Sequence, residues 1–491
     1  MTRLFRSLSL AGVAVAVLSL SACDLTELNE DPNNPTQPTP SYILSSSQVN
    51  LADTYWDSFN NGRFALLYAQ YWTQNQYTDE DRYQYRTNVV DNYWSSYYLA
   101  INNLEEVKRI ISANPAVYAG AETQQAVAEV LQVWAFQNLT DTFGDIPYTE
   151  ALQGAANPSP AYTPQEEIYP DLIARLTAAQ AAIDPGARVA GDVIFGGDAS
   201  KWKKFANSLK MRVAIRMSDQ MPNEAGAAIA QAVQAGAMTS NADNALLNFQ
   251  ASQPFSNPIW ENYNIAGRDD WAVTDALVEE LSSRDDPRLA VYVDPTPASA
   301  DTGTPQYVGL DYGLAGGVAA AIPRNSFSRP GAAIRTQTAP AIFMLYDEVL
   351  FIRAEAAARG LVSGDADGLF EDAVEASLNY WTDGSGTADY IGSLEDLDGS
   401  NYRQVLGVQK WLALYMQGLQ GWSEWRRLGF TGVFETPAGG KADQFDGPIA
   451  VRLVYPSKEG TLNAANLTAA IASQGADTQG TRVWWDVSAN N

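Results

Sequence analysis

Residues 341–360 read AIFMLYDEVLFIRAEAAARG and carry the clearest helical pattern in this chain of 491 residues. Apolar side chains recur there in steps of three, four, three and four, at Ile342, Leu345, Val349, Ile352 and Ala356. Such steps place side chains on one face of a helix, because an α-helix has about 3.6 residues per turn. The stretch therefore predicts a helix over 341–359 that buries this face and ends at Arg359-Gly360.

A second predicted helix follows closely and is expected to pack against the first. Its apolar positions include Phe370, Ala373 and Ala376. Small side chains in both helices, such as Ala354 and Ala373, let the two backbones approach closely, as stacked helix pairs require. The pair resembles one tetratricopeptide unit, and an ordinary helical hairpin explains the same residues equally well.

The helical spacing continues through most of the chain after residue 40. Val405, Val408, Leu412, Tyr415 and Leu419 repeat the steps of three and four and predict a helix over 405–419. Further helices are predicted near 41–53, 62–75, 90–113, 121–140, 165–183, 201–217, 223–235, 272–283 and 366–381. Strands are indicated only near 289–293 and 451–455, and the Gly- and Pro-rich stretch 294–340 is expected to be mainly loop. The predicted fold class is therefore mainly all-α, with long irregular loops and a few short strands.

Composition excludes several classes of protein. Hydrophobic residues make up 46% of the chain and aromatic residues 11%, which excludes a disordered protein. The formal net charge of −26 disfavours a nucleic-acid partner, because the phosphates would be repelled. The chain has no histidine and one cysteine, which excludes histidine-based triads, HExxH zinc sites and internal disulfides. Carboxylate chemistry, oxygen-ligated calcium and binding without chemistry remain, and no cofactor or resident metal is predicted.

The first 40 residues have the pattern of a lipoprotein leader and tether. Two arginines precede an apolar run from Leu8 to Leu20, which is too short to span a membrane. Leu20-Ser21-Ala22-Cys23 resembles a bacterial lipobox and contains the only cysteine. We therefore expect residues 1–22 to be a signal peptide, Cys23 to be lipidated, and residues 23–40 to form an extended tether.

Eight phrases, in order along the chain, resemble one family. They are NEDPNNP at 29–35, TDTFGDIPY at 140–148, GGD with WKKFANSLK at 196–210, DDPR at 285–288, Glu348 to Glu355, QKW at 409–411, WRR at 425–427 and VRLVYP at 451–456. Together they resemble the SusD/RagB family of outer-membrane lipoproteins, and especially its second, SusD-like subgroup. The resemblance covers essentially the whole chain.

This resemblance implies a scaffold of four tetratricopeptide-like helix pairs with irregular insertions that form the ligand site. It implies one SusD-like domain over 41–491, with its ligand-binding part near 240–340 and in the 72–90 loop. It also implies a lipid-anchored, surface-exposed outer-membrane protein that delivers a nutrient to a SusC-like TonB-dependent barrel. Members of the family bind ligand and do not cleave it, so no catalytic residue is predicted.

The ligand site is predicted where aromatic side chains alternate with planar polar ones outside clean helical stripes. Aromatic rings stack on the C–H faces of sugars, while Asn, Asp, Gln and Arg bind hydroxyl groups. Two stretches fit this description, 71–86 and 257–271. The predicted ligand-binding residues are Trp72, Tyr77, Tyr83, Tyr85, Trp260, Tyr263 and Arg268.

Two basic segments are expected to be structural. The apolar stripe of Lys201–Arg216 indicates a helix packed on a neighbour, rather than a helix that binds nucleic acid or an anionic membrane. Trp425-Arg426-Arg427 is expected to form an aromatic–guanidinium stack within the fold, rather than a ligand contact.

Several functions remain open alongside oligosaccharide binding. Tyr-, Asn- and Arg-rich loops suit a peptide or glycoprotein ligand equally well. With 57 acidic residues, a carboxylate pair of a secreted glycoside hydrolase is compatible with the sequence, although strands alternating with helices are missing from the pattern. A periplasm-facing helical-repeat adaptor would also have a lipid and a tether.

Overall fold

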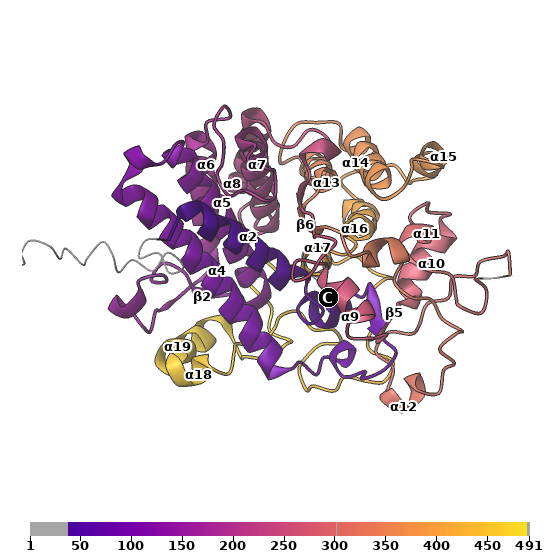
Figure 1. The fold of residues 1–491 in the computed structure, drawn as a ribbon. Helices are drawn as coiled ribbons and strands as arrows, with labels where there is room; N and C mark the ends of the chain where they lie inside the picture. Colours follow the sequence, from indigo (N-terminus) through magenta and orange to yellow (C-terminus); the bar gives the residue numbers. More distant parts are fainter. Residues whose placement is uncertain (1–37, 301, 489–491) are drawn as a thin grey trace, which may run out of the picture.

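A computed structural model describes residues 38–300 and 302–488 of the chain (Figure 1). The predicted signal peptide, the predicted lipidation site Cys23 and most of the predicted tether lie outside these residues. The described part begins just before the first helix, at residue 40.

Helices make up most of the architecture. The longer ones of the first half are α2 (Pro40–Trp56), α4 (Thr87–Ala113), α5 (Ala121–Phe143), α6 (Gln165–Ala182), α7 (Ala199–Arg216) and α8 (Pro222–Ala235). Those of the second half are α13 (Tyr346–Ala358), α14 (Ala366–Trp381), α16 (Tyr402–Ala413), α17 (Gly418–Leu428) and α19 (Ala464–Gln474). Shorter ones are α3 (Leu66–Tyr68), α9 (Pro258–Asn264), α10 (Asp275–Ser283), α11 (Leu289–Tyr292), α12 (Gly316–Ala319), α15 (Thr387–Ile391) and α18 (Glu459–Leu462).

Strands are few and short in the described residues. They are β1 (Trp72–Gln74), β2 (Ile146–Pro147), β3 (Tyr162–Thr163), β4 (Ala245–Leu247), β5 (Trp271–Val273) and β6 (Ala341–Met344). They form three two-stranded antiparallel sheets, β1–β5, β2–β3 and β4–β6. Each sheet joins segments that lie between helices.

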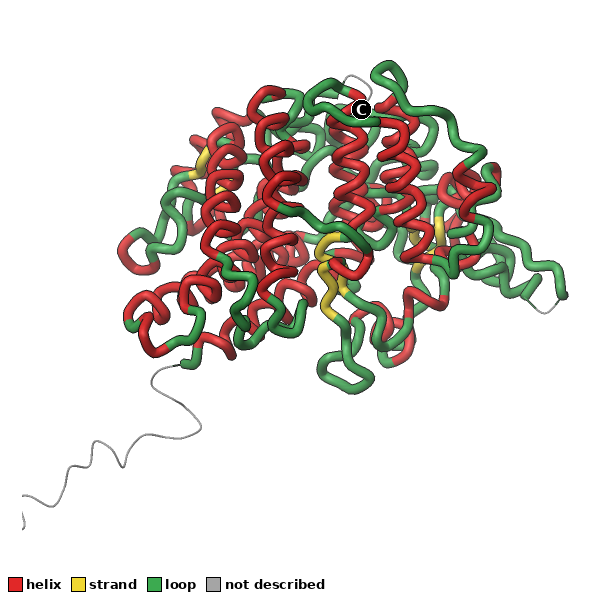
Figure 2. Tube along the Cα trace, turned by 90° about the horizontal axis from the view of Figure 1, so that it is seen from above, coloured by secondary structure: helices red, strands yellow, loops and turns green. Residues whose placement is uncertain are grey.

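Consecutive helices pack on one another in pairs, as the sequence predicted. Helix α4 packs on α5, α6 on α7, α13 on α14, and α16 on α17. The helices lie side by side, and the loops surround them (Figure 2). The segment around α10, α11 and α12 lies at the opposite end of the molecule from α5 and α6 (Figure 1). The fold is a mainly helical, tetratricopeptide-like scaffold with irregular insertions.

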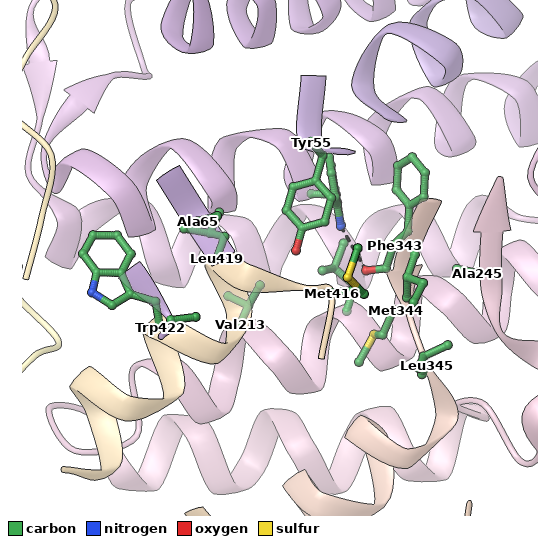
Figure 3. Close-up of a cluster of buried hydrophobic side chains, with 14 of the residues drawn as sticks. Tyr55, Ala65, Val213, Ala245, Phe343, Met344, Leu345, Met416, Leu419 and Trp422 are labelled. Carbon is green, nitrogen blue, oxygen red and sulfur yellow. Dashed lines mark hydrogen bonds between the residues drawn. The ribbon is translucent and has the colours of Figure 1, made fainter. Parts of the chain in front are cut away.

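The stretch 341–360 is buried as predicted, but its first part is not helical. Ala341–Met344 pairs with β4, and α13 begins only at Tyr346. Phe343, Met344 and Leu345 lie in the core close to Tyr55 and Met416 (Figure 3). An apolar residue every three or four positions can therefore also come from a buried strand followed by a helix.

Four further predictions of local structure were wrong. Residues 289–292 form α11 rather than a strand, and the described residues 451–455 form no strand. The predicted helix 62–75 is a π-helical turn, η1 (Asn61–Ala65), followed by α3 and then by strand β1. The predicted helix 405–419 is broken between α16 and α17, where Met416 has a φ of 69°.

A network of buried charges lies where the helix pairs meet. Arg212 of α7 binds Glu348 of α13 through two hydrogen bonds, each 2.6 Å long. Arg216 of α7 contacts Glu424 of α17 at 2.7 Å, and Lys410 of α16 contacts the same carboxylate at 3.0 Å. The basic helix 201–216 is thus a packed, ion-paired helix, as predicted.

The Trp425-Arg426-Arg427 motif completes this network. The Arg426 guanidinium lies 3.7 Å from the ring centroid of Trp422 and donates to two buried carbonyl groups. Arg427 binds both Glu355 and Glu424, and all three side chains are buried. Burial opposes ionisation of Glu424, but the charges of Arg427, Lys410 and Arg216 outweigh it and hold its pKa well below the usual range. The motif is structural, as predicted.

Candidate functional site

The two stretches predicted to bind ligand are brought together by the β1–β5 sheet. Trp72 pairs with Val273, and Gln74 pairs with Trp271. The ladder continues through a 2.9 Å hydrogen bond from the Asn75 N–H to the Asp270 carbonyl. Segments nearly 200 residues apart in the chain therefore meet at one place on the surface.

An open cleft of about 780 Å³ lies beside this sheet. It is lined by the end of α2 and the turn after it, by η1, by the loop after β1, and by α9 with the segment that follows. Its lining residues are Asp57, Ser58, Phe59, Arg63, Tyr77, Arg86, Pro258, Glu261, Asn262, Ile265, Ala266 and Arg268. Three of their apolar side chains are largely exposed, Phe59 at 45%, Tyr77 at 56% and Ile265 at 59%.

Tyr77 is held in an uncommon conformation at the rim of this cleft. Its φ is 56°, in the left-handed region that bulky side chains rarely adopt. The Arg268 guanidinium lies 4.9 Å from the centroid of the Tyr77 ring. Arg268 is itself fixed by an ion pair of 2.6 Å with the buried Asp270. One face of a half-exposed ring is therefore supported by a planar cation.

Asp270 also binds the arginine at the floor of the cleft. Arg63, on the π-helical turn η1, contacts Asp270 at 2.5 Å and Glu80 at 3.5 Å. Glu80 in turn binds Arg86, another lining residue. These ion pairs hold three planar guanidinium groups around the cleft with their charges balanced by carboxylates. Turns of π-helix often occur at functional sites, because they change the direction in which side chains point.

A second, polar cleft of about 460 Å³ shares four lining residues with the first, Asp57, Phe59, Pro258 and Glu261. Asparagine and serine side chains line much of the rest, including Asn60, Asn88, Asn92, Ser96 and Ser256. Burial, together with the charge of Glu261, raises the pKa of Asp53 to about 6. Burial raises the pKa of Asp57 to about 6 as well, against the hydrogen bonds that it accepts from Asn60 and Phe59.

The structure separates the seven predicted ligand residues into three groups. Tyr77 and Arg268 line the main cleft, and Tyr85 lines a small adjoining cavity that shares Arg63 and Arg86 with it. Trp260 and Tyr263 lie on α9, half-buried beside the cleft rather than among its lining residues. Arg335 covers the ring of Tyr263, 4.5 Å from its centroid.

Trp72 and Tyr83 are core residues, each with no exposed surface. The Trp72 indole N–H donates to the Tyr415 hydroxyl at 3.0 Å, and the Tyr83 ring packs edge-on against Tyr68. Neither ring presents a face to a ligand in this structure. Alternation of aromatic and polar residues does not distinguish them from Tyr77, because burial in these loops depends on distant partners.

Sequence reasoning missed Phe59, Arg63 and Ile265. The turn Asp57-Ser58-Phe59-Asn60-Asn61 does place an aromatic residue among planar polar groups, which is the same signal that selected 71–86. Its position between two helical stretches made it look like a connection. Among the described residues, no group of three or more acidic or cysteine side chains is placed to hold a metal ion.

These features define a class of protein, a tetratricopeptide-like helical scaffold with a loop-built aromatic cleft for a ligand. A family model described as "Starch-binding associating with outer membrane", the SusD-like model 2, matches residues 32–456. The chain belongs to this SusD-like family of outer-membrane-associated binding proteins. The resemblance seen in the eight sequence phrases is confirmed.

Solved structures agree with this assignment. A chitin-binding protein has 25% sequence identity and a TM-score of 0.81 over 92% of this chain and 100% of its own. A SusD homolog from Bacteroides uniformis ATCC 8492 has 25% identity and a TM-score of 0.77, over 91% and 100% of the two chains. A chitin-binding SusD homolog from Flavobacterium johnsoniae shares the fold, with 24% identity and a TM-score of 0.77 over 91% and 99%.

A comparison with curated proteins found no match. Within residues 38–300 and 302–488, none of the helices combines the length and the apolar character needed to span a bilayer.

Proposed function

We propose that this chain is a lipid-anchored, cell-surface protein that binds an oligosaccharide and delivers it to a SusC-like TonB-dependent barrel. The observation that carries the proposal is the rim of the main cleft, where Tyr77 and Phe59 are half-exposed beside Arg268 and Arg63. The cleft lies where the 72–90 loop meets the segment after residue 240, which we propose as the ligand-binding part of a single domain over 41–491.

The composition of the two connected clefts suits a sugar chain. Pyranose rings have apolar faces that stack on aromatic rings, and their hydroxyl groups need donors and acceptors at fixed positions. Phe59 and Tyr77 provide the rings, while Asn60, Asn88 and Asn92 provide amide groups in the adjoining cleft. Two solved relatives are named as chitin-binding, so β-linked N-acetylglucosamine chains belong in the first panel of ligands.

The direct test is a binding screen of the purified protein against a glycan panel that includes chitohexaose and maltohexaose. Tyr77→Ala should weaken binding about fivefold, because a lost ring contact is worth ~1 kcal/mol. Tyr42→Ala is the matched control, since Tyr42 is 76% exposed and lines none of these clefts. Equal affinity of wild type and both variants would place the ligand elsewhere, and binding of peptides alone would replace the glycan proposal.

The anchor and the partner are proposed from the lipobox-like sequence and from the family's association with the outer membrane. Cys23→Ser should release the protein from the membrane fraction, and intact mass should show acyl groups only on the wild type. A pull-down from the native membrane through a C-terminal tag should recover a large barrel protein. Protection of the protein from protease in intact cells would indicate a periplasm-facing adaptor instead.

Members of this family are binding proteins, and we propose that this chain has no catalytic activity. The carboxylates most relevant to hydrolysis are Asp53, Asp57 and Glu261, which line the second cleft. Asp57 accepts a 2.7 Å hydrogen bond from the Asn60 backbone and thus helps to form the turn after α2. Release of reducing ends that disappears in Glu261→Gln would show a glycoside hydrolase.

A further inference from the structure

A separate pocket of about 340 Å³ lies next to the main cleft in sequence but shares no lining residue with it. Trp56, the last residue of α2, lines this pocket, whereas the next residue, Asp57, lines the main cleft. The volume is within the range of small-molecule sites. Its lining residues are Trp56, Val291, Ala333, Ile334, Thr336, Thr338, Ala339, Pro340, Ile342, Tyr380, Trp381 and Met416.

The pocket is built from aromatic and aliphatic side chains that are held firmly from behind. Tyr380 and Trp381 end α14, are half-buried, and pack edge-to-face with ring centroids 4.9 Å apart. Trp381 also packs edge-on against Tyr292 at 5.1 Å, and Tyr292 stacks on Tyr415 at 4.0 Å. The predicted ligand residue Trp72 supports this column, because its indole N–H donates to Tyr415.

Two hydrogen-bond donors of the pocket residues are unused. The indole N–H groups of Trp56 and Trp381 are buried and have no hydrogen-bond partner among the described residues. The whole Trp56 side chain is nearly inaccessible, at 2% exposure. A buried donor without a partner destabilises a protein. Two such donors lining one pocket suggest that their acceptors arrive with a ligand.

The backbone at the pocket is also strained. Met416, which lines the pocket, has a φ of 69° in the break between α16 and α17. Its carbonyl oxygen accepts a 3.0 Å hydrogen bond from the Asn61 side chain, which supports this conformation. Strained residues of this kind cluster at ligand sites, where the surrounding structure holds them in place.

We propose that this pocket is a second carbohydrate subsite that binds one neutral pyranose unit. No lining residue carries a charge, which favours a neutral ligand. The rings of Trp381 and Tyr380 would contact the apolar face of the sugar, and the two indole N–H groups would donate to its oxygen atoms. Thr336 and Thr338, both exposed, add hydroxyl groups at the pocket. This inference rests on the proposed function, since it assumes a glycan ligand.

The test uses 15N-tryptophan-labelled full-length protein and follows the 13 indole N–H signals by NMR. Trp56→Phe and Trp381→Phe assign the two pocket signals. Titration with the glycan selected by the panel, or with N-acetylglucosamine as the first probe, should shift both signals saturably. The shifts should persist in Phe59→Ala/Tyr77→Ala, which removes both aromatic rings from the rim of the main cleft. Trp381→Ala should weaken this second binding event about tenfold, which corresponds to ~1.4 kcal/mol.

The outcomes separate the inference from the proposed function. If glycans bind and the Tyr77 variant weakens them, but the Trp56 and Trp381 signals do not move, the second subsite is wrong and water satisfies the indole groups. If no glycan binds anywhere, the proposed function fails first. Shifts caused by peptides and not by sugars would overturn the inference as well. Tyr42→Ala should leave both binding events unchanged.

Discussion

At the residue scale, Tyr77 and Trp72 show how little local sequence says about exposure. Both lie in one aromatic, amide-rich segment, five positions apart. Trp72 is in the β1 strand and is covered by Trp271 and Tyr415. Tyr77 follows a left-handed turn that brings its ring to the surface, under Arg268. The role of each ring is thus decided by residues about 200 and 340 positions away.

Asp347 offers a residue-scale prediction about pH. It is buried in α13, and burial together with the neighbouring Glu348 raises its pKa to about 7. A raised pKa means that the protonated form stabilises the fold below the unfolded pKa of 3.8 and that this stability is lost as pH rises through about 7. Asp347→Asn should therefore increase the free energy of unfolding at about pH 8 by on the order of 2–4 kcal/mol.

Urea unfolding at a series of pH values would measure this effect. The variant and the wild type should have similar stability near pH 4 and should diverge as pH rises. Parallel stability curves across this range would contradict a raised pKa for Asp347.

At the element scale, the break between α16 and α17 is a requirement of packing rather than of local sequence. The apolar steps from Val405 to Leu419 continue without interruption. The chain nevertheless turns at Met416, and Gly418 begins α17 against the backbone of Ala65. A β-carbon on Gly418 would lie 2.4 Å from the Ala65 carbonyl carbon, which is far inside van der Waals contact.

Gly418→Ala should therefore destabilise the protein by about 1–3 kcal/mol, because neither backbone can move without shifting a helix. Gly460→Ala is the matched control, since Gly460 lies in α18 and a β-carbon there meets no atom within 4 Å. That change should alter stability by less than ~1 kcal/mol. Denaturant midpoints would report both effects, and equal stability of the two variants would show that α17 can move away from α3.

At the scale of the whole molecule, buried ion pairs connect helices that are far apart in the chain. Glu355 of α13, Glu424 of α17 and Arg427 of α17 are all buried and in contact. Burial opposes ionisation of Glu355, but Arg427 and Arg359 outweigh it and lower its pKa. Charges removed from water in this way require complete pairing. The network therefore couples the two halves of the scaffold into one packed unit.

Arg427→Met should destabilise the whole molecule by about 3–5 kcal/mol, because Glu355 and Glu424 lose a shared partner in the core. Adding Glu355→Gln should restore part of that loss, which a double-mutant cycle would measure. Arg109→Met is the control, since the Arg109–Glu106 pair is exposed and its loss should have no measurable effect. If Arg427→Met unfolds at the wild-type midpoint, the network does not support the fold.

By itself, the sequence determined that this protein is mainly helical, that its helices pack in pairs, and that its motifs are those of a SusD-like protein. These features follow from local periodicity and ordered phrases, which need no knowledge of distant contacts. It also indicated the two stretches, 71–86 and 257–271, beside which the cleft is found.

Only the tertiary structure decided which side chains face that cleft, where the helix after residue 405 breaks, and that Ala341–Met344 is a strand. The physical reason is that exposure and strand pairing depend on contacts between residues hundreds of positions apart. Val273 against Trp72, Asp270 beneath Arg63 and Arg268, and Ala65 against Gly418 are examples. No pattern within a window of 20 residues contains these partners, because they meet only when the helix pairs have assembled.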